Sequence, residues 1–217
     1  EKGCLTNSIY HYPLFMRFFS TPDLLEIGDV PFITQGDKPT RLEALEYYRR
    51  VSEGLKLKVH LYEKVLQVKG ADGAFEIITD KGTYRSRKVI AAIGFFDHPR
   101  MLNVPGEDLP KVTHYYKEPH PYSRQQVLVV GSGNSAVEAA LECYRHGARV
   151  TLAVRGADFH SGLKYWIRPD IENRIKEEKI TAHFHTEVKE IHPNSVILKK
   201  SGGESLEIPN DFVIAVT

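Results

Sequence analysis

The clearest pattern of hydrophobic and polar positions in this 217-residue chain lies between residues 125 and 155. Apolar runs at residues 127–130 and 150–154 predict two buried strands. Between them, apolar residues are spaced as on one face of a helix, and this stretch follows a turn that contains Gly131 and Gly133. The pattern therefore predicts a strand, a glycine turn, a helix and a second strand, in that order.

The first half of the chain has the pattern of one helix followed by several short strands. Thr40 and Glu43 have the spacing of a capping box, and the apolar residues after them keep helical spacing. Turn signals at residues 71–73 and 80–82 separate the strand patterns. We expect strands at residues 58–62, 64–69, 74–79 and 82–85, and a buried strand at residues 88–93 that ends at Gly94.

The second half continues as a small α/β domain. A helix is expected within residues 164–178, and short strands follow at residues 181–186, 188–192, 195–199 and 204–208. A closing strand is expected at residues 211–217, so that a β-meander is inserted before the last strand. A proline-rich connection leads into this domain, and we place the domain boundary between residues 118 and 119.

The glycine turn predicts that a dinucleotide binds to the chain. Gly131 permits the tight turn, and Gly133 has no Cβ that would keep a pyrophosphate from the backbone. The helix that follows directs its free N–H groups and the positive end of its dipole towards the same place. Ala136 stands where a third small residue packs the helix against the strand.

The residue after the second strand indicates which dinucleotide is bound. An NAD site usually has Asp or Glu there to bind the ribose 2′-hydroxyl, whereas this chain has Arg155. A guanidinium suits a 2′-phosphate, so we expect NADPH rather than NADH. The alternative is an ordinary turn followed by a solvated arginine, which the combined order of strand, turn, helix and strand disfavours.

Composition narrows the range of partners. With 41% hydrophobic residues the chain can form a core, and its net charge of +1 gives no support for nucleic acid or a membrane surface as a partner. It contains no apolar run of about 20 residues and no signal peptide. Its two cysteines form no disulfide framework, which favours a cytoplasmic protein. The chain starts without Met and stops within an apolar strand, so we expect both ends to be cut.

Several segments together resemble the two-dinucleotide-binding flavoprotein superfamily. Within the run Val-Ile-Ala-Ala-Ile-Gly at residues 89–94, residues 91–94 are similar to its Ala-Thr-Gly segment with Ile93 in place of Thr, and residues 214–217 resemble the second such segment. Residues 9–28 and 164–169 most resemble the YpdA-type, thioredoxin-reductase-like enzymes of the bacillithiol system. The resemblance implies an FAD-dependent reductase that uses NADPH to reduce a low-molecular-weight disulfide. It also implies a partial, Rossmann-like FAD-binding domain at residues 1–118 and an NADPH-binding domain at residues 119–217.

The resemblance also implies roles for individual residues. Glu1, with Lys2 beside it, would bind the adenosine ribose of FAD, although Glu1 could equally be an ordinary terminal residue. Ser20 would line the flavin, Val65 would pair with adenine through its backbone, and Ala92 and Gly94 would pass close to the cofactor. The NADPH pyrophosphate would be cradled by Gly131, Ser132, Gly133, Asn134 and Ser135, with Arg155 on the 2′-phosphate. Hydride would pass from nicotinamide to flavin, and no side chain stands out as an acid, base or nucleophile.

Other polar and sulfur-containing residues are expected to have ordinary structural roles. His160, Lys164 and Arg168 are cations within reach of the 2′-phosphate, but we expect them on a solvated face. Cys143 is expected to be a buried thiol and Cys4 a loop thiol. His183 and His185 lack a third ligand in a clear pattern, so no metal site is expected.

Two other functions remain open at this point. Classical thioredoxin reductase activity is not one of them, because the sequence has no Cys-x-x-Cys pair. Pro105-Gly106 before a glycine loop is similar to flavin monooxygenases, although the spacing to His114 does not match their fingerprint. The third reading is a non-catalytic NADP-binding module that senses redox state. The partner would be a small disulfide or another small oxidant, and relatives suggest a homo-oligomer.

Overall fold

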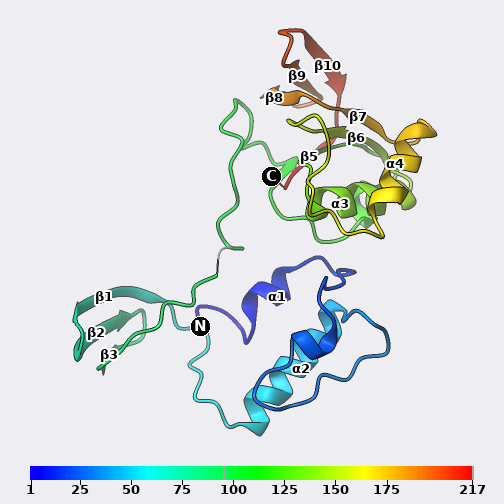
Figure 1. Ribbon diagram of the computed structural model, residues 1–217. Helices are drawn as coiled ribbons and strands as arrows, with labels where there is room; N and C mark the ends of the chain where they lie inside the picture. The colour runs from blue at the N-terminus through cyan, green and yellow to red at the C-terminus, as the bar shows by residue number, and fades with distance from the viewer. Residues whose placement is uncertain (95, 217) are drawn as a thin grey trace. The chain divides into compact units, whose positions relative to one another are not determined.

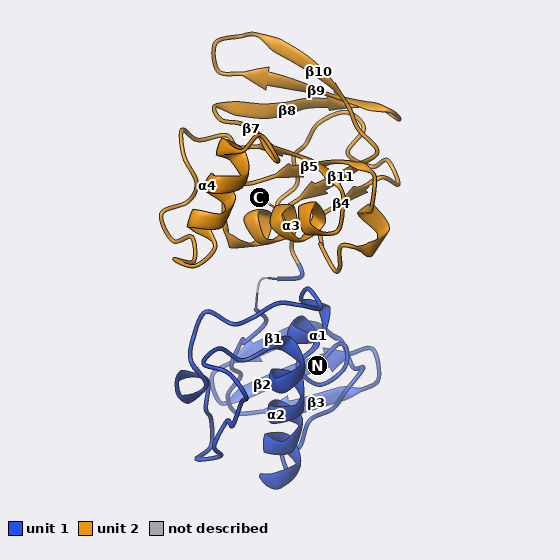
Figure 2. Ribbon diagram, turned by 90° about the vertical axis from the view of Figure 1, so that its right-hand side faces the viewer, with its two compact units in different colours: residues 1–97 blue, residues 98–217 orange. Residues whose placement is uncertain are grey.

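The computed structural model describes residues 1–94 and 96–216. The chain forms two compact units, and the division between them falls between residues 97 and 98 (Figure 2). This division comes earlier than the expected boundary after residue 118. Leu102, Val104 and Leu109, from the proline-rich connection, pack against a hydrophobic cluster of unit 2. The connection is therefore part of the second core, because its apolar side chains find their cover there.

Unit 2 is built on a parallel sheet of five strands in the order β4-β11-β5-β6-β7. The helix α3 connects β5 to β6, and α4 connects β6 to β7 (Figure 1). The bounds of these elements are β4 Val112–Thr113, η2 His120–Tyr122, β5 Gln126–Val130, α3 Asn134–Arg145, β6 Arg149–Ala153, α4 Arg168–Lys176, β7 Thr181–His183 and β11 Phe212–Ala215.

The expected β-meander is present between β7 and β11. It is an antiparallel sheet in the order β10-β9-β8, formed by β8 Thr186–Ile191, β9 Ser195–Lys200 and β10 Ser205–Pro209. Figure 2 shows the parallel sheet between α3 and this meander. The sequence prediction of a Rossmann-like α/β fold with an inserted meander is confirmed for this unit.

Alternation along β5 explains why the sheet is covered on both faces. Val127 and Val129 belong to the cluster formed with α3, whereas Leu128 and Val130 belong to the cluster formed with the meander. Successive side chains of a strand point to opposite faces of the sheet. A strand that is apolar at every position is therefore buried only when other elements pack against both faces. The unbroken apolar run at residues 127–130 therefore encodes a central strand.

The described residues of unit 1 form two helices, a 3₁₀ turn and a separate antiparallel sheet in the order β1-β2-β3. The elements are α1 Asn7–His11, η1 Pro22–Leu24, α2 Arg41–Gly54, β1 Val65–Ala71, β2 Ala74–Thr79 and β3 Thr83–Ser86. The capping box is confirmed: the Glu43 N–H donates to Thr40 Oγ1 at 3.2 Å, and the Thr40 N–H donates to Glu43 Oε2 at 2.8 Å. A small core forms where Tyr47 of α2 stacks on Phe32, with ring centroids 4.2 Å apart.

Two expected strands of unit 1 do not form. Residues 88–93 form no strand with the described residues, and Ile90 and Ile93 are 91% and 83% exposed. The prediction of a buried strand there was wrong, because an apolar segment becomes a central strand only where neighbouring strands flank it. Residues 58–62 also form no strand: Tyr62 has a φ of 53°, and its N–H donates to the carbonyl of Gly3 at 3.0 Å.

Candidate dinucleotide-binding site

The glycine turn and Arg155 lie at the same edge of the parallel sheet. Val130 and Ala153 pair across β5 and β6, and the chain leaves both strands immediately afterwards. The N–H of Gly131 donates to the carbonyl of Ala153 at 3.1 Å, which joins the two strand ends. The carboxyl edge of a parallel sheet is where open α/β folds bind their ligands, so this edge carries the candidate site.

Gly131 and Gly133 are needed for different physical reasons. Gly131 has a φ of 140°, and a Cβ added there would lie 2.5 Å from the carbonyl oxygen of Val216 and 3.0 Å from Cβ of Ala136. Gly133 has an ordinary φ of −88°, and a Cβ added there would meet nothing within 4 Å. The fold itself therefore requires glycine at 131, whereas at 133 the absent side chain leaves open space in front of the backbone.

That open space faces the beginning of α3. Gly133 is the N-cap of this 12-residue helix, and no side chain caps it. The first turn of a helix has N–H groups without intrahelical partners, and its dipole favours an anion. A pyrophosphate in front of Gly133 would fit both the free space and these donors.

Arg155 is exposed and forms no ion pair or hydrogen bond within the described ranges 1–94 and 96–216. Arg168, by contrast, contacts two carboxylates, at 3.3 Å to Asp158 and 3.0 Å to Glu172. A guanidinium that already bonds to two carboxylates has fewer N–H donors and less uncompensated charge available for a phosphate than an unpaired guanidinium has. Of these two arginines, Arg155 is therefore the better candidate for a 2′-phosphate.

Lys164 corrects one sequence expectation. Its side chain is only 7% exposed, and its Nζ lies 2.6 Å from Oε1 of Glu138 on α3. The expectation that Lys164 lies on a solvated face was wrong, because the loop folds back over α3 and Glu138 neutralises the buried ammonium. His160, on the same loop, is exposed.

Sequence reasoning also missed how Asn134 is used. Its side-chain oxygen accepts from the N–H of Lys164 at 2.7 Å, and its amide nitrogen donates to the carbonyl of Gly162 at 3.2 Å. Asn134 and Glu138 are four residues apart and so share one face of α3, which is otherwise rich in small apolar residues. Two polar residues at this spacing were the available signal.

The expected flavin-binding residues all belong to unit 1 and are spread over several segments. Glu1 is exposed, with Oε1 accepting from the N–H of Gly3 at 3.1 Å, and Lys2 forms an ion pair with Asp97 at 2.8 Å. Gly94 has a φ of 62° and open space where a Cβ would stand. The remaining three are Ser20, which is half-buried before η1, and Val65 and Ala92, which are exposed. The exposed carboxylate of Glu1 and the space beside Gly94 fit a cofactor, and the roles of these residues remain predictions.

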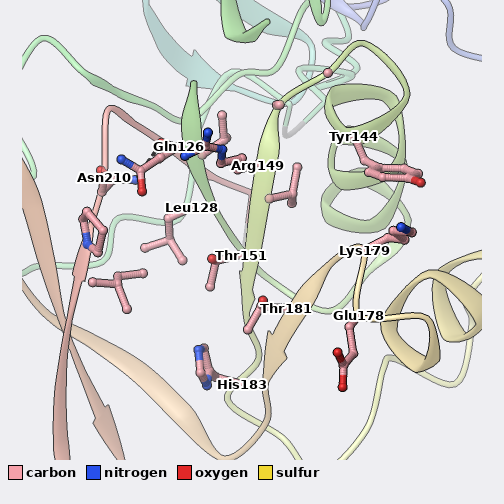
Figure 3. Close-up of a pocket in the computed structure, with 16 residues that line it drawn as sticks. Gln126, Leu128, Tyr144, Arg149, Thr151, Glu178, Lys179, Thr181, His183 and Asn210 are labelled. Atoms are coloured by element: carbon pink, nitrogen blue, oxygen red, sulfur yellow. Dashed lines mark hydrogen bonds between the residues drawn. The ribbon is translucent and has the colours of Figure 1, made fainter. Parts of the chain in front are cut away.

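Unit 2 also contains a cavity of about 510 Å³ (Figure 3). Its walls include Gln126 and Arg149, which begin β5 and β6, together with Asn210. Gln126 and Arg149 mark the amino ends of these two strands, opposite the edge that carries Gly131 and Arg155, and neither Gly131 nor Arg155 lines the cavity. The cavity is therefore separate from the candidate dinucleotide site.

The two cysteines are free, in agreement with the sequence. Burial raises the pKa of the Cys143 thiol to about 12, and Cys143 is fully buried against the β5–β6 sheet. Cys4 is half-buried, with its Sγ 3.6 Å from Oδ1 of Asn7. The described residues contain no group of three or more side chains that could hold a metal ion, and His185 lies outside β7 with a φ of 52°.

The parallel sheet, the uncapped helix after a glycine turn and the free arginine at the next strand end define a Rossmann-like dinucleotide-binding domain. The family described as pyridine nucleotide-disulphide oxidoreductase matches the chain over residues 1–217. The chain belongs to this family, and the class of flavoprotein expected from the sequence is confirmed.

Several relatives match the whole chain, among them the following two. The bacilliredoxin reductase Bdr of Bacillus subtilis is 45% identical over 218 residues, which cover 100% of this chain and 67% of the relative. The structure of bacillithiol disulfide reductase Bdr (YpdA) from Staphylococcus aureus is 44% identical, with a TM-score of 0.97, and the match covers 100% of this chain and 67% of that one. The similarity to the YpdA type that was expected from residues 9–28 and 164–169 is thus confirmed.

A monooxygenase has a similar fold at a much lower sequence identity. The flavin-containing monooxygenase from Stenotrophomonas maltophilia has a TM-score of 0.73 at 19% identity, over 97% of this chain and 66% of its own. At that identity the match shows a shared fold alone.

Among the described residues, no helix is long and apolar enough to cross a membrane.

Proposed function

We propose that this chain is the nucleotide-handling part of an FAD-dependent NADPH oxidoreductase that reduces a bacillithiol-related disulfide. Unit 2 binds NADPH at the glycine turn, and unit 1 contributes residues to the FAD site. The chain spans 67% of the length of the Bacillus subtilis relative, so the activity is proposed for the whole protein to which these residues correspond.

The observation that carries the proposal is the pairing of an open glycine position with a free arginine. Gly133 leaves room for a pyrophosphate at the start of α3, and Arg155, at the next strand end, forms no ion pair or hydrogen bond with the residues that the structure describes. Together they account for two features of NADPH, the pyrophosphate and the 2′-phosphate. When FAD and NADPH are bound, the flavin and the nicotinamide supply the redox chemistry, and the residues of this chain bind and orient the two cofactors.

The electron acceptor is proposed from the relatives. One is named for a protein, bacilliredoxin, and the other for a small disulfide, bacillithiol disulfide. The sequence has no Cys-x-x-Cys pair, and the Cys143 thiol is buried with a raised pKa. Neither feature supports an exposed redox pair in unit 2, which favours an acceptor that meets the flavin directly. Assays with each of the two acceptors would distinguish them.

The visible absorption spectrum of the purified protein, before and after anaerobic NADPH, tests the proposal. A yellow protein that bleaches on NADPH supports bound FAD that accepts hydride. NADH should bleach it far more slowly at equal concentration. A protein that binds neither FAD nor NADPH would contradict the proposal.

A non-catalytic NADP-binding module remains the second candidate for this chain alone. Unit 2 has its own two hydrophobic clusters and holds every residue expected at the NADPH site. A colourless protein that still binds NADPH would favour this second function. We also propose a cytoplasmic location, supported by the two free cysteines, and assembly into a homo-oligomer.

A further inference from the structure

We propose that residues 156–164 form a preassembled wall of the NADPH site, and that Asn134 is the positioning residue that fastens this wall to the glycine turn. The wall is defined by these nine positions, between Arg155 and the helix α4. This inference rests on the proposed use of NADPH. It assigns to Asn134 a role in nucleotide preference rather than in direct contact with the pyrophosphate.

The side chain of Asn134 bonds to the wall through both its oxygen and its nitrogen. Its oxygen accepts from the N–H of Lys164 and its amide donates to the carbonyl of Gly162, at 2.7 and 3.2 Å. One partner is a donor and the other an acceptor, so the orientation of the amide is fixed. Asn134 is the first residue of α3, so these bonds tie the wall to the beginning of the helix.

A second tie joins the wall to the glycine turn itself. The N–H of His160 donates to the carbonyl of Ser132 at 3.0 Å. The His160 ring is held as well, because its Nδ1 accepts from the N–H of Gly162 at 3.0 Å. With Nδ1 acting as an acceptor, the neutral ring carries its proton on Nε2, which is left as a donor.

The third tie is the buried ion pair of Lys164 with Glu138. The Nζ–Oε1 distance is 2.6 Å, with the lysine side chain 7% and the glutamate 27% exposed. Separating the pair while the lysine stays buried would take the carboxylate partner away from the ammonium, which is strongly unfavourable. The wall therefore cannot leave α3 without exposing Lys164, and Asn134 and Glu138 together hold it along one face of the helix.

Arg155 sits where this wall begins, and its other side is also fixed. The carbonyl of Gly156 accepts from the N–H of His185 at 2.9 Å, and the carbonyl of Val154 accepts from the N–H of Thr186 at 3.0 Å. The backbone of Arg155 is thus held between two bonds, one to His185 just before β8 and one to Thr186, the first residue of β8. Preorganised groups lose less entropy when they bind, so a fixed wall strengthens contact with the 2′-phosphate. NADH has no such group and gains nothing from this wall.

Asn134→Ala in the full chain tests the inference. Dissociation constants for NADPH and NADH are measured by titration, and amide hydrogen exchange is followed at His160 and Lys164. We expect NADPH to bind about tenfold more weakly, because two hydrogen bonds that hold the wall are lost, and NADH to change by less than about twofold. Exchange at both amides should become faster. Asn173→Ala, an exposed position on α4, is the matched control and should change neither reading.

Lys164→Met is the second variant, in case the loss of Asn134 unfolds the chain. It removes the ion pair but keeps the apolar stem, and it should shift the ratio of NADPH to NADH affinity in the same direction. Equal loss of both nucleotides would overturn the inference, because Asn134 would then serve a part that they share. Faster exchange with an unchanged affinity ratio would overturn it too. If the unaltered chain binds both nucleotides equally, the proposed use of NADPH fails first, and the exchange data still report whether Asn134 fastens the wall.

Discussion

The two units of this chain bury their sheets very differently. In unit 2, four of the five residues of β5 are buried, between α3 on one face and the meander on the other. In unit 1, all seven residues of β1 are exposed. A strand is stabilised by burial of its apolar side chains as well as by its hydrogen bonds to neighbouring strands. Because the sheet of unit 2 is packed on both faces, unit 2 has the larger share of buried apolar surface. The NADPH site can therefore be probed within a core of its own, whereas the expected flavin residues lie on sparsely covered segments.

Core truncation should show this contrast most strongly. Leu128→Ala removes a side chain that is fully buried between β5 and the meander, and it should lower the free energy of unfolding by about 3 kcal/mol. Val68→Ala, on the exposed β1, should cost less than about 0.5 kcal/mol. Denaturant unfolding measures both. Similar losses would mean that β1 is covered in solution.

The two glycines of the turn should separate stability from binding. Gly131→Ala places a Cβ against the carbonyl of Val216 at a φ of 140°, so it should destabilise the fold by roughly 2–3 kcal/mol. Gly133→Val adds a Cβ that would meet no described atom within 4 Å, and it should lower the melting temperature less than Gly131→Ala does, while it weakens NADPH and NADH alike by about 100-fold. Unchanged affinity in Gly133→Val would remove the turn from the site.

Charge reversal at Arg155 should discriminate between the two nucleotides. Arg155→Glu replaces the proposed 2′-phosphate ligand by a carboxylate, and it should weaken NADPH by about 30-fold, equivalent to about 2 kcal/mol. NADH should be spared, and titration of both nucleotides gives the comparison. Lys189→Glu, a reversal at an exposed position of β8, controls for net charge. Loss of both nucleotides in Arg155→Glu would contradict the assignment.

The smallest expected effect is the alkaline response of Cys143. Burial raises the pKa of this thiol to about 12, so the folded state holds a proton that the unfolded state releases at lower pH. Stability from this group is complete below the unfolded pKa and declines as pH rises towards the folded one, by about 1 kcal/mol between roughly pH 8 and pH 10. Cys143→Ala should remove that part of the decline in denaturant unfolding. An unchanged pH dependence would show that the thiol is not responsible.

Local patterns predicted much of the fold. The strands at residues 127–130 and 150–154, the capping box at Thr40 and the inserted meander were all expected, because periodicity and capping depend on residues close in sequence. The apolar segment at residues 88–93 was misjudged by the same reasoning. Its composition is that of a central strand, but only neighbouring strands can make it one.

At the candidate site, the sequence by itself determined the glycine turn, the start of α3 and the arginine at the strand end. Each depends on backbone chemistry within a few residues. Only the tertiary structure decided that Asn134 and Glu138 bind the loop at residues 156–164 and that Lys164 is buried. These contacts join residues 26–30 positions apart, and whether a charged side chain is solvated or paired depends on what the fold places beside it.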